Sequence, residues 1–199
     1  MNADYEIGLY NKGYQYIAGI DEVGRGPLAG PVVAACVIMP TDIINDKIKD
    51  SKKIAEKTRE IVSEWIIRNA VCYAFGVVDE KTIDEINILN ATKRAFNIAY
   101  SQIEKSPNYL LIDGKDVITA DCEARAVIGG DNKIYTIAAA SVIAKVYRDN
   151  IMRKMDEIYP QYGFIRNKGY GTKEHIDALK KYGPCPIHRM SFIRKIVGV

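Results

Sequence analysis

The 199-residue chain lacks any segment that is long and apolar enough to enter a membrane. Its longest run without a charged residue, from Gly26 to Thr41, is 16 residues long and contains three prolines, whereas a transmembrane helix needs about 20 apolar residues. The first ten residues, MNADYEIGLY, carry acids and no apolar block, unlike a secretory signal peptide. We therefore expect a protein that spans no membrane and works in the cytoplasm.

Cysteine and histidine are both scarce. The four cysteines are widely spaced and form no CxxC pair, which argues against a zinc knuckle or a redox motif, so we expect reduced thiols. The two histidines, His175 and His188, are too far apart in sequence to form a metal-binding pair on one helix, and we expect both on the surface or in loops. The cysteines are Cys36, Cys72, Cys122 and Cys185.

The charges are nearly balanced in total but unevenly distributed. The chain has 28 Lys and Arg against 25 Asp and Glu, and with 48% hydrophobic residues its composition is that of a globular protein rather than a disordered one. Residues 1–144 carry 16 basic and 20 acidic residues, whereas residues 145–199 carry 12 basic and 5 acidic ones. The basic segment is either a solvated helical surface or a face that meets a polyanion such as nucleic acid.

Hydrophobic patterning predicts a layered α/β protein. Apolar, β-branched runs bounded by glycine and proline predict strands at 16–22, 31–39, 70–78, 109–112 and 124–128. Apolar residues at helical spacing predict helices at 55–68, from Thr82 to about Ser106, at 137–159 and at 172–182. Thr82 and Glu85 would form a capping box at the start of the second helix. Because short links join the early strands, we expect a sheet that is partly antiparallel.

Acidic residues gather at the ends of the predicted strands. Asp21 and Glu22 end an apolar strand, Asp113 ends LLIDG, and Asp131 follows a glycine pair in VIGGD. Taken singly, each is compatible with a salt bridge or a solvated turn. Together, four carboxylates at one edge of a sheet would repel unless cations lay among them, and oxygen ligands favour Mg²⁺ or Mn²⁺. In a regular strand Asp21 and Glu22 point to opposite faces, so one shared site requires the strand to end or bend there.

A glycine-rich turn follows the first two acids. Gly24 to Ala29 formally matches the GxGxxG/A dinucleotide fingerprint, but that fingerprint opens a helix. Here Pro27 and Pro31 are followed by the predicted strand PVVAACVIM, so we reject the match. Two readings remain: a simple hairpin turn, or a backbone that approaches a ligand closely at Gly24 and Gly26, beside Arg25.

Two further polar segments have open interpretations. Ser51, Lys52 and Lys53 follow Asp50 just before a predicted helix, where they either start the helix or contact phosphates. Tyr170 lies between two glycines in the basic segment, where its ring either packs internally or contacts a sugar or base.

These motifs together resemble those of ribonuclease HII. The resemblance covers about residues 16–192 and implies a ribonuclease H-like fold, a central mixed five-stranded sheet flanked by helices, with a small helical C-terminal segment. It also implies cleavage of the RNA strand of RNA/DNA hybrids and incision 5′ of single ribonucleotides in duplex DNA. The motifs, in order, are DEVGRGPLAGPVV from Asp21, DSKK from Asp50, LLIDG from Leu110, GGDNKIYTIAAASVIAKVYRD from Gly129 and KGYGT from Lys168.

The resemblance also assigns roles to residues. It implies two divalent ions, Mg²⁺ or Mn²⁺, on four catalytic carboxylates, a 2′-hydroxyl reader in the glycine turn, a tyrosine on the sugar at the junction, and a segment that holds the nucleic-acid backbone. Many relatives carry Lys where this chain has Gly129, and Asp149 is a rival to Asp131 as the fourth acid. The catalytic, metal-binding carboxylates would be Asp21, Glu22, Asp113 and Asp131, and the residues that read the 2′-hydroxyl would be Gly24, Arg25 and Gly26. The tyrosine on the sugar would be Tyr170, and the segment that holds the backbone would be Ser51, Lys52 and Lys53.

Two alternatives remain beside this reading. Ribonuclease HIII prefers hybrids and normally carries an additional N-terminal domain, for which the 15 residues before the first predicted strand leave no room. A non-catalytic nucleic-acid-binding module would use only the basic segment. We expect a monomeric, single catalytic domain over 1–199, with about 160–199 forming a basic helical appendage.

Overall fold

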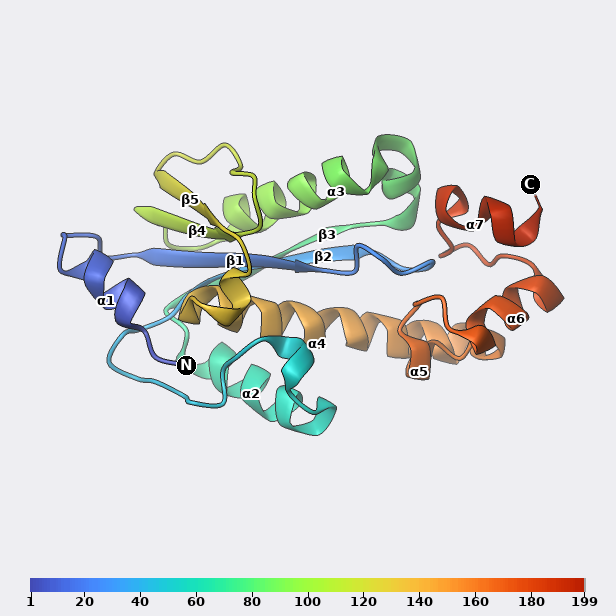
Figure 1. Cartoon of the computed structure of the whole chain (residues 1–199), viewed down its shortest axis with the longest axis horizontal. Coiled ribbons are helices and arrows are strands. Elements are labelled where there is room, and N and C mark those ends of the chain that lie inside the picture. The colour runs from blue at the N-terminus through green and yellow to red at the C-terminus, as the bar shows by residue number, and fades with distance from the viewer. Residues whose placement is uncertain (199) are drawn as a thin grey trace.

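A mixed five-stranded sheet forms the centre of the molecule (Figure 1), in a computed structural model that describes residues 1–198. The strand order is β3-β2-β1-β4-β5. Strand β1 pairs antiparallel with β2 and parallel with β4, so the predicted mixed sheet is confirmed. The strands are β1 (Ile17–Val23), β2 (Val32–Ile38), β3 (Cys72–Val78), β4 (Tyr109–Asp113) and β5 (Glu123–Val127).

The parallel pairing of β1 with β4 positions the acids. Ile20 is the register partner of Ile112, so the residues that follow each of them lie side by side at one edge of the sheet. Asp21 and Asp113 are those following residues. Neighbouring parallel strands thus bring together acids that are far apart in the sequence.

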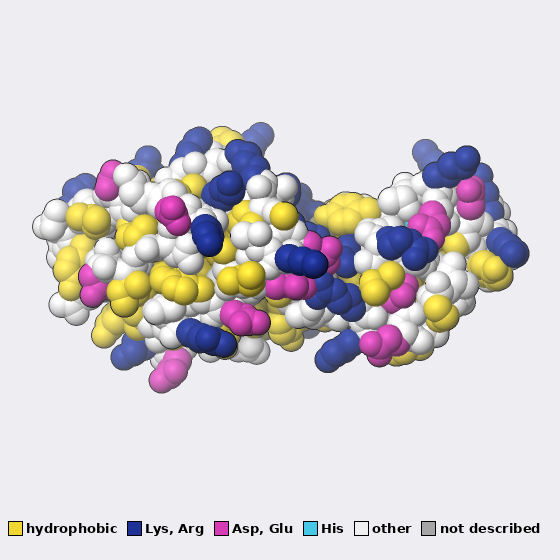
Figure 2. Space-filling model, turned by 90° about the horizontal axis from the view of Figure 1, so that it is seen from below, with side chains coloured by type: hydrophobic (Ala, Val, Ile, Leu, Met, Phe, Trp, Pro, Cys, Tyr) yellow, Lys and Arg dark blue, Asp and Glu magenta, His cyan; other side chains and the backbone are white. Residues whose placement is uncertain are grey.

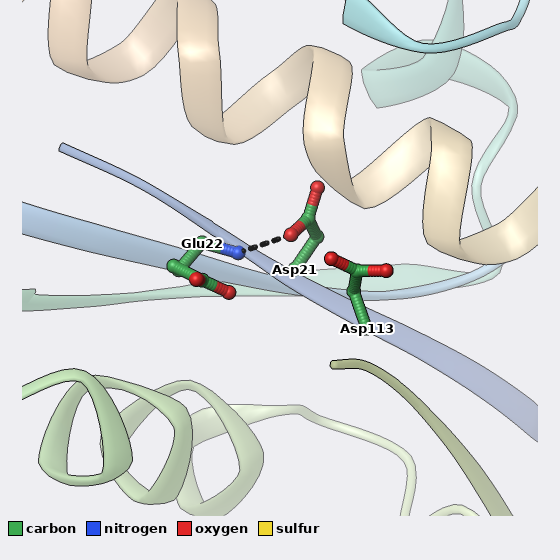
Figure 3. Close-up of side chains that lie close together, drawn as sticks. All are labelled: Asp21, Glu22 and Asp113. Atoms are coloured by element: carbon green, nitrogen blue, oxygen red, sulfur yellow. Dashed lines mark hydrogen bonds between the residues drawn. The ribbon is translucent and has the colours of Figure 1, made fainter. Parts of the chain in front are cut away.

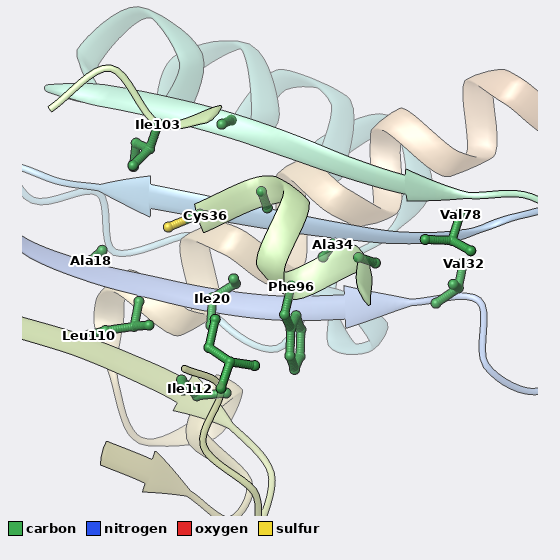
Figure 4. Close-up of a cluster of buried hydrophobic side chains, with 14 of the residues drawn as sticks. Ala18, Ile20, Val32, Ala34, Cys36, Val78, Phe96, Ile103, Leu110 and Ile112 are labelled. Carbon is green, nitrogen blue, oxygen red and sulfur yellow. The ribbon is translucent and has the colours of Figure 1, made fainter. Parts of the chain in front are cut away.

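Helices cover both faces of the sheet. Helix α3 (Glu80–Gln102) packs on one face, and α4 (Tyr135–Ile158) packs on the other, with α2 (Glu56–Asn69) behind it (Figure 1). Between the sheet and α3, apolar side chains such as Ile20, Ile112 and Phe96 form a core (Figure 4). Each fully buried chain of this size contributes about 1.5–3 kcal/mol relative to exposure.

Helix α4 lies unusually close to the sheet. A Cβ on Gly19 would lie 2.3 Å from the carbonyl carbon of Thr136, so only glycine fits at this point of β1. Alanines at 138, 139, 140 and 144 continue the contact and are fully buried. This close packing fixes the position of α4 relative to the acidic end of β1.

The predicted start and continuity of α3 are wrong. Asp79 accepts a hydrogen bond from the Thr82 amide (2.8 Å), so the helix is capped by Asp79 and not by a Thr82–Glu85 box. At Asn87 the backbone leaves helical geometry (φ 66°, ψ 165°), and the Asn87 side chain accepts from the amides of Leu89 and Asn90. An asparagine that satisfies local amides in this way competes with the regular helix.

The sequence patterning missed the first helix, α1 (Asp4–Tyr10). Its Glu6 is buried, and Glu6 Oε1 accepts from the amide (2.7 Å) and hydroxyl (2.9 Å) of Thr136 in the first turn of α4. Ile134, which precedes α4, offers no side-chain cap of its own. A carboxylate from α1 therefore caps α4, and burial raises the pKa of Glu6.

Residues 160–198 form a C-terminal lobe with an apolar cluster of its own. A short 3₁₀ turn (Pro160–Tyr162) leads into α5 (Phe164–Asn167), α6 (Lys173–Tyr182) and α7 (Met190–Val197). The cluster includes Phe164, Leu179 and Ile193, together with Met152 from the end of α4. Figure 2 shows this smaller lobe joined to the larger one by a narrower, hollowed waist.

Three further expectations are tested by residues 1–198. The expectation that His175 and His188 lie on the surface is wrong, because their exposed fractions are 0% and 3% in the C-terminal lobe. The cysteines are free thiols, as expected. No helix within the described residues combines the length and apolar character that a membrane crossing needs.

Candidate active site

Three carboxylates converge at the ends of β1 and β4. Asp21, Glu22 and Asp113 each offer an oxygen, and these atoms all lie within 4.8 Å of one another. Asp21 turns toward α4 and Glu22 toward the other face of β1, yet the two still share one site (Figure 3). The Glu22 amide donates to Asp21 Oδ1 at 2.7 Å, which fixes the Asp21 carboxylate in place.

The electrostatics of this cluster fit a divalent cation. Burial, followed by the charges of Glu22 and Asp113, raises the pKa of Asp21 well above its ordinary value, while a hydrogen bond from Ser141 lowers it. Burial also raises the pKa of Glu22, opposed by Arg25, whose Nη1 lies 3.2 Å from Glu22 Oε1. Three crowded carboxylates with one partly exposed arginine retain excess negative charge, which bound cations would neutralise.

Asp131 lies beside this cluster rather than within it. It is buried in the 3₁₀ turn Gly130–Asn132 that follows β5. The Gly130 amide donates to Asp113 Oδ1 at 2.6 Å and lowers the pKa of Asp113, which burial and the Asp131 charge raise. The turn therefore orients Asp113, and Asp131 contributes its charge from just outside the group of three.

The rival acid, Asp149, has cationic partners of its own. Its carboxylate lies 2.7 Å from Lys145 Nζ and 3.6 Å from Arg59 Nη1, and it is buried on α4. These two ion pairs satisfy Asp149 as a structural residue.

The glycine turn after β1 is held from inside by Arg189. Gly24 has a φ of +96°, which favours glycine. The Arg189 guanidinium donates to the carbonyls of Gly24 (2.6 Å), Arg25 (3.0 Å) and Gly30 (2.7 and 2.9 Å). Arg25 and Gly26 remain exposed at the surface of the turn.

A second buried arginine, Arg148 of α4, supports the same turn. It donates to the carbonyls of Pro31 (2.9 Å), Ala29 (3.1 Å) and Lys168 (2.9 Å). Both arginines are 0% exposed, and burial lowers the pKa of Arg189 to about 9. Two desolvated cations thus fix the turn through carbonyl oxygens.

Tyr170 lies next to the glycine turn. Its side chain is exposed (41%), and its Cε1 atom lies 3.9 Å from the position that a Cβ on Gly26 would take. The Leu28 amide donates to the Gly169 carbonyl at 2.8 Å, which joins the two loops. The structure therefore brings together the turn and the tyrosine that the sequence separates by more than 140 residues.

The Ser51–Lys53 segment presents its lysines outward and its serine inward. Asp50 caps this 3₁₀ turn by accepting from the Lys52 amide (3.0 Å), and α2 begins only at Glu56. Ser51 is buried, and its Oγ lies 3.0 Å from Ser141 Oγ, so its hydroxyl faces the protein interior. Lys52 and Lys53 are exposed, and the Lys52 charge lowers the pKa of Asp113.

Three supporting residues were missed by sequence reasoning. Ser141 lies in the small-residue run AAASVIA, which is typical of helix packing, yet it hydrogen-bonds Asp21 and Ser51. Arg148 and Arg189 were counted only as basic charge. The available signal was Arg148 itself, which lies four residues after the small-residue run AAASVIA on the helix predicted at 137–159.

The family model and the curated relatives that match this chain name one family. The family model of ribonuclease HII matches residues 18–195. The ribonuclease HII of Caldanaerobacter subterraneus subsp. tengcongensis is 53% identical over 193 residues, which is 97% of this chain and 80% of that protein. That of Acetivibrio thermocellus is also 53% identical, over 97% of this chain and 75% of its own. The crystal structure of ribonuclease H2 from Pyrococcus horikoshii OT3 superposes with a TM-score of 0.77 at 28% identity, covering 92% of this chain and 98% of that one.

Proposed function

The chain belongs to the ribonuclease HII family, and we propose that it is a metal-dependent endoribonuclease acting on ribonucleotides in duplexes. Its substrates are RNA/DNA hybrids, in which it cleaves the RNA strand, and duplex DNA with a single embedded ribonucleotide, which it incises on the 5′ side. The observation that carries the proposal is the convergence of Asp21, Glu22 and Asp113 within 4.8 Å. Burial and mutual repulsion disfavour the charged form of these acids, and bound cations would relieve both.

Four acids form the proposed metal site. Asp21, Glu22 and Asp113 would hold Mg²⁺ or Mn²⁺, and Asp131 would complete the set from the adjacent turn. Two bound divalent ions would supply an activated water and stabilise the leaving oxygen, so no side-chain nucleophile is required. The Glu22 amide and Ser141 orient Asp21, and the Gly130 amide orients Asp113. Cleavage leaves a 3′-hydroxyl and a 5′-phosphate.

Recognition of the ribose falls to the glycine turn and the tyrosine. The backbone at Gly24, Arg25 and Gly26 reads the 2′-hydroxyl, which is the group that distinguishes RNA from DNA at one nucleotide. Tyr170 packs on the sugar at the junction, and its proximity to Gly26 supports this assignment.

The nucleic-acid backbone is held by the Ser51–Lys53 segment. Lys52 and Lys53 contact phosphates through their exposed ammonium groups, while the buried Ser51 anchors the segment to Ser141. We treat residues 1–199 as one catalytic domain that acts as a monomer in the cytoplasm, with 160–199 as its basic appendage. All the proposed site residues come from a single chain.

The deciding experiment compares three labelled duplexes: all-DNA, DNA with one ribonucleotide, and an RNA/DNA hybrid. Each is incubated with Mg²⁺, Mn²⁺ or a chelator. We expect metal-dependent cutting of the second and third duplexes only. Cutting of the hybrid alone would favour a ribonuclease HIII-like activity, and binding without cutting would favour a non-catalytic module.

A further inference from the structure

Two buried histidines form a continuous chain of hydrogen bonds in the C-terminal lobe. His188 Nε2 lies 2.9 Å from His175 Nε2, and His175 Nδ1 lies 2.9 Å from the carbonyl oxygen of Tyr170. At the other end, the Cys185 amide donates to His188 Nδ1 at 2.9 Å. The chain therefore runs from Cys185 through both imidazoles to Tyr170.

When both histidines are neutral, only one assignment of donors and acceptors satisfies this series of hydrogen bonds. Since the Tyr170 carbonyl can only accept, the proton of His175 lies on Nδ1, and His175 Nε2 accepts from His188 Nε2. His188 Nδ1 then carries no proton and accepts from the Cys185 amide, with the Cys185 carbonyl oxygen and Sγ at 3.2 and 3.1 Å. Burial lowers the pKa of both histidines, that of His188 to about 4, so both are neutral at neutral pH.

Neither histidine is available for other chemistry. Each ring nitrogen already has a partner in the chain, so none is free to ligate a metal or to transfer a proton to a substrate. The rings pack edge-on against Tyr162 and Phe164, with centroid distances from 4.8 to 6.3 Å. What this arrangement can do is hold the Tyr170 backbone in one place.

The backbone at His188 pairs with the glycine turn. Ala29 and His188 form an isolated antiparallel bridge, and the Gly30 amide donates to the Ile187 carbonyl at 2.8 Å. His188 therefore pairs with the turn through its backbone, and its side chain is linked to the Tyr170 carbonyl through the side chain of His175. It adds a link between these two loops beside the Leu28–Gly169 hydrogen bond and the Arg148 side chain.

We propose that His188 and His175 are positioning residues that set the Tyr170 ring against the Gly24–Gly26 turn for ribonucleotide recognition. This inference rests on the proposed function, because it assigns Tyr170 to the sugar. The histidines act only through Tyr170, so their loss weakens incision no further once the ring is absent.

The test is a double-mutant cycle on duplex DNA with one ribonucleotide. His188→Asn keeps an acceptor for the Cys185 amide but removes the donor to His175, and Tyr170→Ala removes the ring while keeping the carbonyl. We expect His188→Asn to lower kcat/KM about 10-fold alone, in keeping with the cost of a small displacement of a positioning group. In the Tyr170→Ala background it should lower kcat/KM less than 2-fold, because the energies of coupled residues do not add.

A matched control separates positioning from general destabilisation. Ile193→Ala weakens the apolar core of the same lobe outside the hydrogen-bond chain, and its effect should be the same in both backgrounds. All assays are run well below each variant's melting temperature. If His188→Asn does not fold, His175→Gln is used instead, because it interrupts the same series of hydrogen bonds at the neighbouring residue.

The outcomes are distinct. Equal losses from His188→Asn with and without the Tyr170 ring, or no loss at all, overturn the inference. A wild-type protein that does not incise the duplex instead overturns the proposed function, before any variant is compared.

Discussion

The crowded acids predict that Asp113→Asn makes the metal-free protein more stable while abolishing its activity. The oxygens of Asp21, Glu22 and Asp113 lie within 4.8 Å of one another. At an effective dielectric constant of about 20, two unit charges at that distance repel by about 3 kcal/mol. Asparagine removes one charge, and its side-chain oxygen can still accept from the Gly130 amide.

The gain should be smaller than the full repulsion, because the raised pKa of each acid lets the cluster take up protons more readily and so relieve part of that repulsion. We expect the free energy of unfolding to increase by about 1–3 kcal/mol, which is roughly 2–10 °C in melting temperature for a chain of this size. The assay is thermal unfolding at pH 8 with a chelator and again with Mg²⁺. The wild type should gain stability from Mg²⁺, and the variant should gain little.

Asp149→Asn is the matched control. Asp149 is also a buried carboxylate, but it lies 2.7 Å from Lys145 Nζ, so its neutralisation should destabilise the protein. The reasoning is refuted if Asp113→Asn melts at or below the wild-type temperature without metal, or if it retains wild-type turnover with Mg²⁺.

Three further predictions concern the supports of the site. Arg189→Lys should raise KM for the single-ribonucleotide duplex in steady-state assays, because one ammonium cannot replace a guanidinium that donates to the carbonyls of Gly24, Arg25 and Gly30. An unchanged KM would argue that these hydrogen bonds do not hold the turn for substrate binding. Glu6→Ala should cost about 1–2 kcal/mol in denaturant unfolding by uncapping α4, whereas Glu6→Gln, which keeps the acceptor, should cost less; equal losses would contradict capping. The pKa of His188, about 4 in the folded protein, lies below its ordinary value of 6.5. As the pH falls from 6.5 toward 4 only the unfolded chain binds this proton, so wild-type stability should fall by about 2–3 kcal/mol more than that of His188→Asn.

The sequence predicted the parts of the site that depend on strand ends. Asp21, Glu22 and Asp113 follow apolar runs directly, and the parallel pairing of β1 with β4 brings them together as expected. The long helix α4 followed from periodicity, and the partly antiparallel sheet followed from the short links between the early strands.

Contacts between distant loops could not be predicted from the sequence. Arg148 and Arg189 resemble surface charges in a basic segment, and only the fold shows that carbonyl oxygens surround them. The two histidines were misplaced for the same reason, because each is buried by the other and by neighbouring aromatic rings. The Asn87 break in α3 depends on a side-chain cap that outweighs a regular apolar pattern.

Helix α4 fixes the spacing between three regions of the molecule. Ser141, Arg148 and Met152 lie along it at intervals of seven and four residues, which places them on one face over about 16 Å of helix. Ser141 contacts Asp21 of the proposed metal site, Arg148 supports the glycine turn, and Met152 enters the core of the C-terminal lobe. Since a single helix links the proposed metal site to the proposed ribose-binding turn, we expect the incised bond to keep a constant offset from the recognised ribose whatever the surrounding duplex.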